Sequence, residues 1–449
     1  MKKILMLAAA LAFGLPVWAK DFNVLDFGAR GDGATLDTAA VQRAIDAAAA
    51  DGGRVVIPHG RKFLIATLTL KSGIDFHVDG ELLISTNQAD YASDSVITAL
   101  NAPNLKITGS GKISGQSLAF MTGYDPVGEW WLFKPWRPKM FLLTGCTNLT
   151  VRDITFGDAP YWGLHLLGCD HVLVDNVTVA NRLDVPNCDG LDCDHSRNVE
   201  IRDCHVTAGD DAIVVKATRQ AQDFGACSNV WVHDCVLETQ DSGVKIGTET
   251  TADIHDIRFE RCKILRGSRG LTIQLRDEGN VYNIDFNDIE FVSRYHGDPW
   301  WGRGEAISLT AIPRVATNKL GTLHDIRVRN VSGRAENSIR IRGSAESRVR
   351  NVLLENVSVK LDRWTRYRGG LFDNRPTKVI ADIEPHGNPG IMISQADGVT
   401  LRHCRIRWGS NLPDYFTHAL EAENVTDLQL TDFIGTAAHP GCDEAITIH

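Results

Sequence analysis

One short motif recurs along the chain and constrains its fold more than any other feature. A polar residue precedes a stretch in which polar and apolar residues alternate, as in Asn148-Leu-Thr-Val-Arg-Asp-Ile and Asn198-Val-Glu-Ile-Arg-Asp-Cys. Alternation with a period of two is typical of β-strands. The copies begin at Asn104, Asn148, His171, Asn198, Asn229, Asp256, Asn283, Asp325, Asn351, Gly398 and Asp427, and most of the intervals are 23 to 31 residues long.

A repeat of this length predicts one coil of a parallel β-helix. About 25 residues are too few for a propeller blade of about 40, and the helical half of a leucine-rich repeat is missing. Stacked coils lie about 4.8 Å apart, so equivalent side chains form columns along the solenoid. One solenoid accommodates 449 residues without several separate cores. We therefore expect an all-β, single-stranded parallel β-helix that forms one domain over residues 20–449.

A short helix is expected to cover the N-terminal end of this solenoid. The alanine-rich stretch 38–50 has apolar residues at Val41, Ala44, Ile45 and Ala48, which is helical spacing, and Asp37 is a candidate N-cap. A solenoid needs such an element because its first coil has no neighbour to cover the core.

The first 19 residues have the pattern of a secretory signal peptide. Lys2 and Lys3 precede an apolar run, and Val17-Trp18-Ala19 fits a cleavage site. The run is too short for a membrane span, and no later run reaches 18 apolar residues. The net charge of −9 argues against a nucleic-acid partner. We expect a secreted or periplasmic monomer without a membrane span.

The ten cysteines fall into two groups. Cys204, Cys235, Cys262 and Cys404 share one repeat position with Ile154 and Val177 of other coils, which predicts a buried column of free thiols. Disulfides are the alternative in a secreted chain, and six cysteines remain candidates for pairing: Cys146, Cys169, Cys188, Cys193, Cys227 and Cys442. No Cys-x-x-Cys pair is present, so a zinc site is not expected.

Three intervals between repeats are long, from 104 to 148, 283 to 325 and 351 to 398. Insertions in solenoids become loops, often on a binding face. These intervals hold six of the ten tryptophans, and Trp300 and Trp301 are candidates to stack on sugar rings. The alternative is that such tryptophans only pack the loops, because large aromatic side chains are usually mostly buried.

Acidic residues gather at one turn of the repeat. Alignment by repeat position places Asp189, Asp211, Ser242 and Arg269 in one column, with Asp210 beside it, if residues 181–187 carry a short insertion. Carboxylates this close raise at least one pKa, and a protonated acid beside an ionised one is the pair that glycoside hydrolysis requires. Plain turns and a calcium site are the alternatives, because Asp and Gly favour turns and acidic loops bind calcium.

At these residues the chain resembles glycoside hydrolase family 28, the polygalacturonases and their relatives. The most specific matches are Asn187-Cys188-Asp189-Gly190 and Gly209-Asp210-Asp211, with further likeness at Phe27-Gly28-Ala29-Arg30-Gly31-Asp32-Gly33 and Asp158-Ala159-Pro160-Tyr161-Trp162. The resemblance implies a right-handed β-helix and hydrolysis with inversion. It implies Asp210 as the general acid and Asp189 with Asp211 as the carboxylates that activate water. The expected substrate is a pectic or related plant cell-wall polysaccharide or oligosaccharide.

Two departures from the family pattern affect the expected substrate. The family's Gly-His-Gly falls on Asp241-Ser242-Gly243, and its Arg-Ile-Lys falls on Thr272-Ile273-Gln274. The family associates those cations with the uronate carboxylate, so their loss argues against plain polygalacturonan. Lys245, one coil from Thr272, and Arg269 are candidates to bind a carboxylate instead, as is Asn187 for substrate contact. The alternative is that both cations are solvated surface charges.

Two other functions are compatible with this scaffold. A lyase would use a base to abstract a proton beside a carboxylate, often with calcium, and a non-catalytic glycan-binding β-helix or adhesin would release no reducing ends. The lyase is disfavoured because the sequence has no evident calcium loop, and the binding module because the three acids are intact. No cofactor and no metal is expected.

Overall fold

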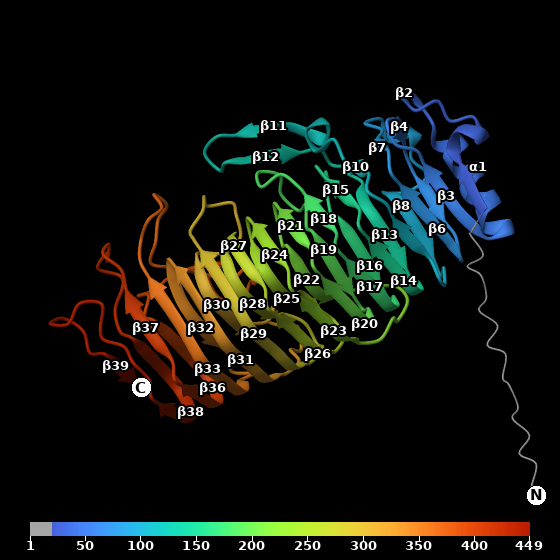
Figure 1. Cartoon of the computed structure of the whole chain (residues 1–449). Helices are drawn as coiled ribbons and strands as arrows, with labels where there is room; N and C mark the ends of the chain where they lie inside the picture. Colours follow the sequence, from blue (N-terminus) through green and yellow to red (C-terminus); the bar gives the residue numbers. More distant parts are fainter. Residues whose placement is uncertain (1–19) are drawn as a thin grey trace, which may run out of the picture.

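The computed structural model describes residues 20–449, so the predicted signal peptide lies outside the described residues. Its parallel strands stack coil upon coil into one long right-handed β-helix (Figure 1). Each coil contributes to three ladders of parallel strands, which we call the first, second and third faces. Among residues 20–449, none of the helices is long and apolar enough to cross a membrane.

The first face carries the repeat motif. It runs through β1 (Lys20–Asn23), β3 (Gly53–Ile57), β6 (Ile74–Val78), β9 (Lys106–Thr108), β14 (Thr147–Arg152), β17 (Asp170–Asp175), β20 (Arg197–Arg202), β23 (Cys227–His233) and β26 (Ile254–Glu260). It continues with the first halves of β29 (Val281–Ser293), β31 (Leu323–Ala335) and β33 (Val349–Leu361), then the second halves of β36 (Ile391–Arg402) and β38 (Leu420–Thr431).

The second face follows after a short turn. It runs through β2 (Asp32–Leu36), β4 (Lys62–Ile65), β7 (Glu81–Ile84), β10 (Lys112–Ser114), β15 (Thr155–Gly157), β18 (Thr178–Ala180), β21 (His205–Ala208), β24 (Val236–Thr239) and β27 (Lys263–Gly267). The second halves of β29, β31 and β33 extend it to β37 (Arg405–Trp408).

The acidic turn lies directly before the strands of the third face. It runs through β5 (Leu68–Leu70), β8 (Ser95–Leu100), β13 (Lys139–Thr144), β16 (Leu164–Leu167), β19 (Leu191–Asp194), β22 (Ile213–Ala217), β25 (Ser242–Thr250), β28 (Arg269–Leu275), β30 (Glu305–Ala311) and β32 (Asn337–Arg342). The first halves of β36 and β38 and strand β39 (Ile446–Ile448) complete it.

The repeat starts mark a sharp bend of the backbone. All eleven predicted start residues have positive φ angles, from 51° at Asp427 to 67° at Gly398. Asn and Asp tolerate this left-handed conformation better than other residues with a side chain, which explains the polar start of the motif. Neighbouring starts are also hydrogen-bonded, as where Asn229 Nδ2 donates to Asn198 Oδ1 at 2.7 Å.

The N-terminal end is covered as expected by helix α1 (Thr38–Asp51), which buries Val41, Ala44, Ile45 and Ala48 against the first coils. Asp37 occupies the N-cap position, as expected, but its side chain makes no capping hydrogen bond to the helix. The Asp37 carboxylate accepts from the backbone N–H groups of Arg30 at 2.7 Å and Gly31 at 2.9 Å instead, because the chain folds back over the helix start. Short 3₁₀ turns lie at η1 (Val24–Phe27), η2 (Gln88–Asp90) and η3 (Ser117–Phe120).

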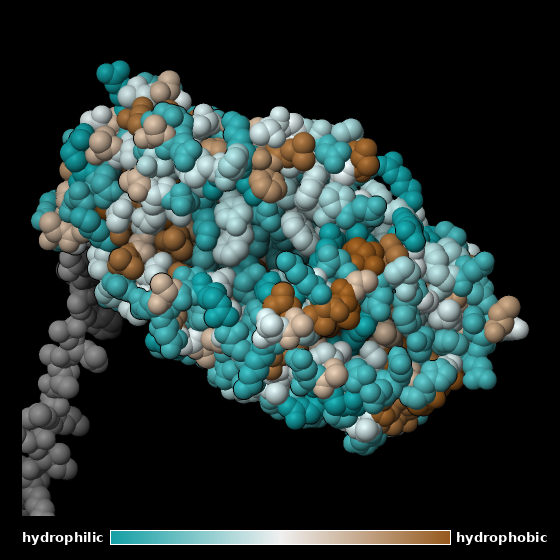
Figure 2. All heavy atoms as spheres, turned by 180° about the vertical axis from the view of Figure 1, so that it is seen from behind, coloured by the Kyte–Doolittle hydropathy of each residue, from teal (hydrophilic) through white to brown (hydrophobic). Residues whose placement is uncertain are grey.

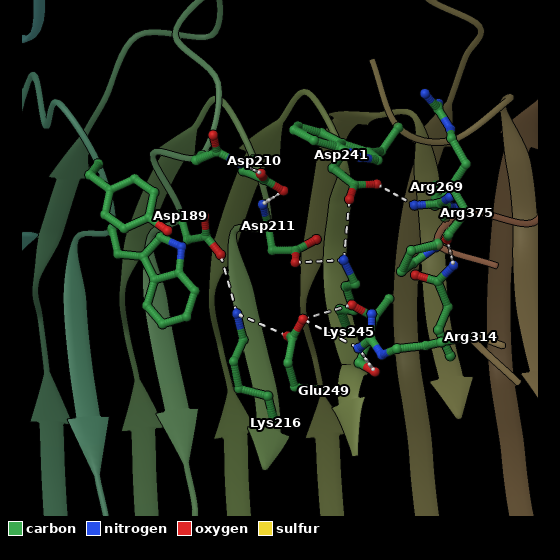
Figure 3. A pocket seen from close by; sticks show the side chains of 17 residues that line it. Asp189, Asp210, Asp211, Lys216, Asp241, Lys245, Glu249, Arg269, Arg314 and Arg375 are labelled. Atoms are coloured by element: carbon green, nitrogen blue, oxygen red, sulfur yellow. Dashed lines mark hydrogen bonds and ion pairs between the residues drawn. The ribbon is translucent and has the colours of Figure 1, made fainter. Parts of the chain in front are cut away.

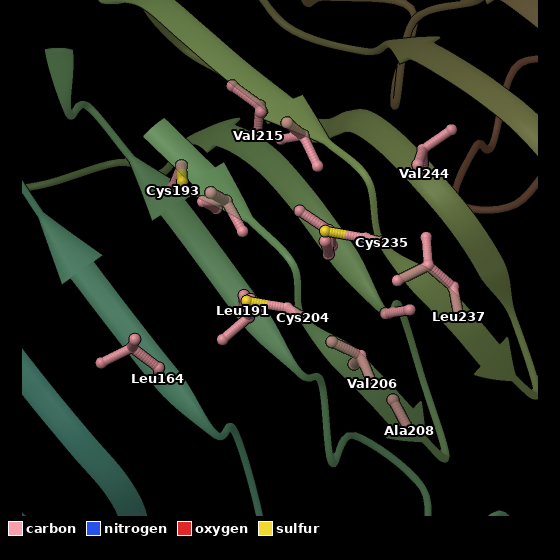
Figure 4. Packing of buried hydrophobic residues seen from close by; sticks show 14 of the residues in the cluster. Leu164, Leu191, Cys193, Cys204, Val206, Ala208, Val215, Cys235, Leu237 and Val244 are labelled. Carbon is pink, nitrogen blue, oxygen red and sulfur yellow. The ribbon is translucent and has the colours of Figure 1, made fainter. Parts of the chain in front are cut away.

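The cysteines of the described chain are all free, and all but Cys442 are buried. Figure 4 shows Cys193, Cys204 and Cys235 among leucine and valine side chains in the core. The predicted column of thiols is thus confirmed, and the six cysteines that were candidates for disulfides form none in this structure. Their thiols fill the same apolar role as the valines of neighbouring coils.

The three long intervals form insertions at one edge of the solenoid. Residues 115–138, 294–304 and 362–390 all lie at the turn between the second and third faces. They contain the antiparallel hairpins β11 (Met121–Asp125)–β12 (Trp130–Phe133) and β34 (Leu371–Asp373)–β35 (Ile383–Pro385). The insertions also contact one another: Trp300 Nε1 donates to Gly128 O at 2.9 Å, and the Tyr367 hydroxyl donates to Glu129 at 2.6 Å.

Candidate active site

Three aspartates meet at the turn that leads into the third face (Figure 3). Asp189 precedes β19, and Asp210 with Asp211 precedes β22 in the next coil. The strand register pairs Leu191 with Ile213, so Asp189 and Asp211 occupy equivalent positions, as the repeat alignment predicted. One carboxylate oxygen of each aspartate lies within 4.8 Å of the others. All three side chains are buried, with 3% to 8% of their surface exposed.

Two lysines lie beneath two of these aspartates. Lys216, on β22, has its Nζ 3.5 Å from Asp189 Oδ2 and 2.9 Å from Asp192 Oδ1. Lys245, on β25, donates to Asp211 Oδ2 at 2.7 Å and to Asp241 Oδ2 at 3.3 Å. Among the described residues, no cationic side chain comes within 4.0 Å of the Asp210 carboxylate. It instead accepts a weak hydrogen bond from Asn187 Nδ2 at 3.4 Å.

Burial raises the pKa of all three carboxyl groups. The pKa of Asp189 rises to about 7, with the charge of Asp192 adding to burial and Lys216 opposing it. The pKa of Asp211 rises to about 8, because burial outweighs the attraction of Lys245. The pKa of Asp210 rises well above its ordinary value, through burial and then the charges of Asp189 and Asp211. Asp210 is therefore favoured to hold a proton, since no cation lies within 4.0 Å of it among the described residues to oppose the rise.

The predicted cations are buried rather than solvated. Arg269 is 1% exposed; its Nη1 donates to Asp241 Oδ1 at 2.6 Å, and its Nη2 lies 3.1 Å from Asp373 Oδ2. Lys245 is 6% exposed and pairs with Asp211 and Asp241. The alternative of solvated surface charges is thus wrong for both. Each lines the pocket, but each already has protein carboxylates as partners.

The pocket above the acids has a volume of about 270 Å³, at the lower limit of the roughly 300–1,000 Å³ of small-molecule sites. Figure 2 shows one face of the molecule, which is largely hydrophilic and hollowed near its middle. Several lining residues were not predicted as site residues, among them Tyr161, Trp162, Lys216, Arg314 and Arg375. Tyr161 and Trp162 stack with ring centroids 5.7 Å apart.

The carboxylates also form a donor set that a hard cation would accept. The ammonium groups of Lys216 and Lys245 contact Asp189 and Asp211, however, and supply the positive charge that a metal would bring. The calcium alternative is therefore disfavoured at this site.

The comparison with known families bears directly on this arrangement. The model of the glycosyl hydrolases family 28 matches residues 52–366, more than half of the chain. The chain belongs to glycoside hydrolase family 28. Within the family, it is 28% identical over 283 residues to a probable polygalacturonase of Arabidopsis thaliana. The alignment covers 60% of this chain and 58% of that protein. The chain thus spans little more than half the length of this relative.

Solved structures of family 28 share the fold. The exopolygalacturonase of Yersinia enterocolitica superposes with a TM-score of 0.71 at 20% identity, over 92% of this chain and 78% of that one. The exopolygalacturonase of Thermotoga maritima gives a TM-score of 0.64 at 22% identity, over 76% and 87%. At these identities the likeness concerns the right-handed parallel β-helix alone.

The two adjacent tryptophans that were expected to bind sugar differ in their exposure. Trp301 is partly exposed and lines the pocket. Trp300 is fully buried, packed between Trp130 and Trp301 with its indole N–H bonded to Gly128. The expectation that Trp300 stacks on a sugar is therefore wrong, because neither ring face is open, and its position is structural.

The departures from the family pattern lie beside the acids. Thr272 and Gln274, which occupy the Arg-Ile-Lys positions, are 0% and 1% exposed. Asp241 occupies the Gly-His-Gly segment and connects Lys245 to Arg269. Arg137 is a further residue that the sequence did not indicate: its Nη2 donates to Asn187 Oδ1 at 2.9 Å and its Nη1 to the carbonyls of Pro160 and Pro186. It lies in a long insertion, where the repeat offers no register.

Proposed function

We propose that this chain is a secreted hydrolase of pectic or related plant cell-wall glycans, in which Asp210 is the general acid. The observation that carries the proposal is the unequal pairing of the three aspartates. Asp189 and Asp211 each have a lysine partner, whereas Asp210 has none, and burial with the neighbouring carboxylates raises its pKa well above its ordinary value. A carboxyl group in such surroundings keeps a proton that it can donate.

The chemistry follows from this difference. Asp210 transfers its proton to the glycosidic oxygen as the bond from that oxygen to the anomeric carbon breaks. Asp189 Oδ1 and Asp211 Oδ1 are buried and accept no hydrogen bond from the described residues, so each retains an unused acceptor position for a water molecule bound in the site. An ionised carboxylate there takes a proton from water as the water oxygen bonds to the anomeric carbon. The products are two shorter sugars, one with a new reducing end.

Stereochemistry is an independent test. Carboxyl groups about 6.5–9.5 Å apart usually give inversion, and those about 5–5.5 Å apart usually give retention through a covalent intermediate. Here the nearest oxygens lie within 4.8 Å, so this rule alone would favour retention. We propose inversion, on the family resemblance and on the two carboxylates available to water. Proton NMR of the first-formed anomer decides, and a retained anomer would contradict the inverting mechanism.

The charges of the pocket support a substrate other than plain polygalacturonan. The five cationic side chains in the lining are all paired with protein carboxylates: Lys216, Lys245, Arg269, Arg314 and Arg375. A chain with a carboxylate on every sugar would have to compete with these pairs. We therefore propose a pectic glycan or oligosaccharide that is less densely charged.

The decisive experiment compares Asp210→Asn with Asp203→Asn on a panel of pectic oligosaccharides. Asp203 is an exposed turn residue with φ of 53°, which asparagine also tolerates, so its replacement is a matched control. Mass spectrometry identifies the products. We expect Asp210→Asn to lose about 10²–10⁴-fold in turnover while Asp203→Asn retains it. Turnover at the wild-type rate in a folded Asp210→Asn protein would contradict the assignment.

The same panel of oligosaccharides distinguishes a hydrolase from a lyase and from a glycan-binding protein. A lyase would give unsaturated products that absorb ultraviolet light, and a binding protein would retain glycans without new reducing ends. Secretion is tested by the N-terminal sequence of exported protein, which we expect to begin at Lys20.

A further inference from the structure

The side of the pocket toward the C-terminus is covered by protein. Thr272, Ser308 and Arg340 occupy successive positions of one column on the third face and point away from the core. Their exposed fractions are only 0%, 2% and 0%. Thr272, Ser308 and Arg340 are hidden because another segment of the chain lies across their part of the third face.

That segment is 371–377 of the third insertion, which we call the wall. The Gln274 amide donates to Arg375 O at 3.2 Å, and Arg340 Nη2 donates to Asn374 Oδ1 at 2.6 Å. Asp373, at its start, pairs with Arg269 and accepts from the backbone N–H of Gly302 at 2.7 Å. The wall therefore crosses the outer faces of β28, β30 and β32 directly beside the acids.

The wall is also fixed at its far end. The Thr377 hydroxyl donates to Pro313 O at 2.6 Å, and the N–H of Lys378 donates to Arg314 O at 2.7 Å. Beyond it lies a second pocket of about 400 Å³, which includes Pro313 and Val379 and shares no lining residue with the catalytic pocket. A glycan lying along the third face would have to pass through the wall to occupy both.

On its opposite side, toward the N-terminus, the catalytic pocket borders a groove instead of a wall. This groove has a volume of about 350 Å³, and Tyr161 lines both spaces. We call it the aromatic groove; its lining is Asp94, Phe133, Pro135, Trp136, Arg137, Lys139 and Tyr161. Phe133 is 45% exposed, and rings that are partly open to solvent offer an apolar face to a sugar.

We propose that a glycan enters the catalytic pocket end-on from the aromatic groove, so that the enzyme removes units from a chain end and does not cut within chains. This inference rests on the proposed function and adds its mode of action. The wall limits how much of the chain extends past the scissile bond, and the groove holds the remainder. The pocket of about 270 Å³ extends from the acids to the wall, where Arg375 and Pro376 line it.

The product time course on a long substrate tests this directly. We expect one small product size from the earliest time points, and viscosity that falls only in proportion to the bonds broken. Early release of mixed intermediate sizes with a rapid fall in viscosity would overturn end-on entry while leaving the hydrolase intact. Absence of product from every glycan of the panel would instead overturn the hydrolase, and this inference with it.

A pair of variants tests the groove. Phe133→Ala removes the exposed ring, and Leu132→Ala removes an equally exposed neighbour on β12 that lines no part of the groove. For Phe133→Ala we expect kcat/KM to fall about three- to tenfold on long oligosaccharides, as for the loss of an aromatic contact. On the shortest cleaved substrate we expect no change, and Leu132→Ala should behave as wild type on both. An equal fall on short and long substrates, or no fall on either, would contradict the role of the groove.

Discussion

The ammonium group of Lys245 is expected to set the pH range in which the aspartates work. It lies 2.7 Å from Asp211, and its charge lowers the pKa of Asp189, Asp210 and Asp211 alike. Two unit charges 4 Å apart interact by about 4 kcal/mol at an effective dielectric constant of 20. Since one pKa unit corresponds to about 1.36 kcal/mol, this interaction is worth up to about three units.

Lys245→Met should therefore move the pH profile upward. Turnover needs one ionised carboxylate at the water, so activity is lost as the pH falls through the pKa of that group. Removal of the nearby cation raises this pKa, which stands at about 7 for Asp189 and about 8 for Asp211. We expect the acidic limb to move up by about one to three pH units, the upper figure being the full Coulomb interaction. The alkaline limb moves in the same direction, because Lys245 also lowers the pKa of Asp210.

The measurement is kcat/KM against pH, which reports ionisations of the free enzyme. Because the carboxylates interact, the apparent values belong to the cluster rather than to single residues. Lys62→Met is the control: Lys62 pairs with Glu81 at 3.0 Å at the surface of the second face, far from the acids. An acidic limb that stays in place or moves down in a folded Lys245→Met protein would refute the electrostatic reasoning.

Three further predictions concern the core, the insertions and the metal. In native protein one thiol, that of Cys442, should react rapidly with a thiol reagent, and all ten should react after unfolding without reductant; a lower final count would reveal disulfides. Trp300→Ala should lower the free energy of unfolding by about 3–5 kcal/mol, measured by calorimetry, because it empties a fully buried site. Trp301→Ala should mainly raise KM, and a larger loss of stability in Trp301→Ala than in Trp300→Ala would contradict both assignments. Chelation should leave turnover unchanged, since Lys216 and Lys245 already balance the carboxylates; a loss restored by calcium would contradict this.

The sequence predicted the periodic part of the molecule well. The starts of the repeat coincide with left-handed bends, and the column from Asp189 to Arg269 follows from counting positions within coils. This succeeded because each coil pairs only with its neighbours, so that spacing along the chain translates directly into position on a face.

The insertions could not be predicted in this way. Asp373 and Arg375 reach the site from about a hundred residues beyond Arg269, at positions that no repeat relates to it. Burial also separates Trp300 from Trp301, although they are adjacent in the sequence. Arg269 was placed in the right column, but its two carboxylate partners, Asp241 and Asp373, make its role differ from that of a free anion binder.

The contacts between insertions have a consequence for how the solenoid opens. Stacked coils normally fray from their ends, because each is held only by the next. Here the bonds from Trp300 to Gly128 and from Tyr367 to Glu129 join segments 172 and 238 residues apart, outside the stack. These bonds hold the catalytic coils together, so those coils should exchange their amide hydrogens as one cooperative unit. The C-terminal coils beyond β36 are not joined by these bonds and should exchange faster, one coil at a time.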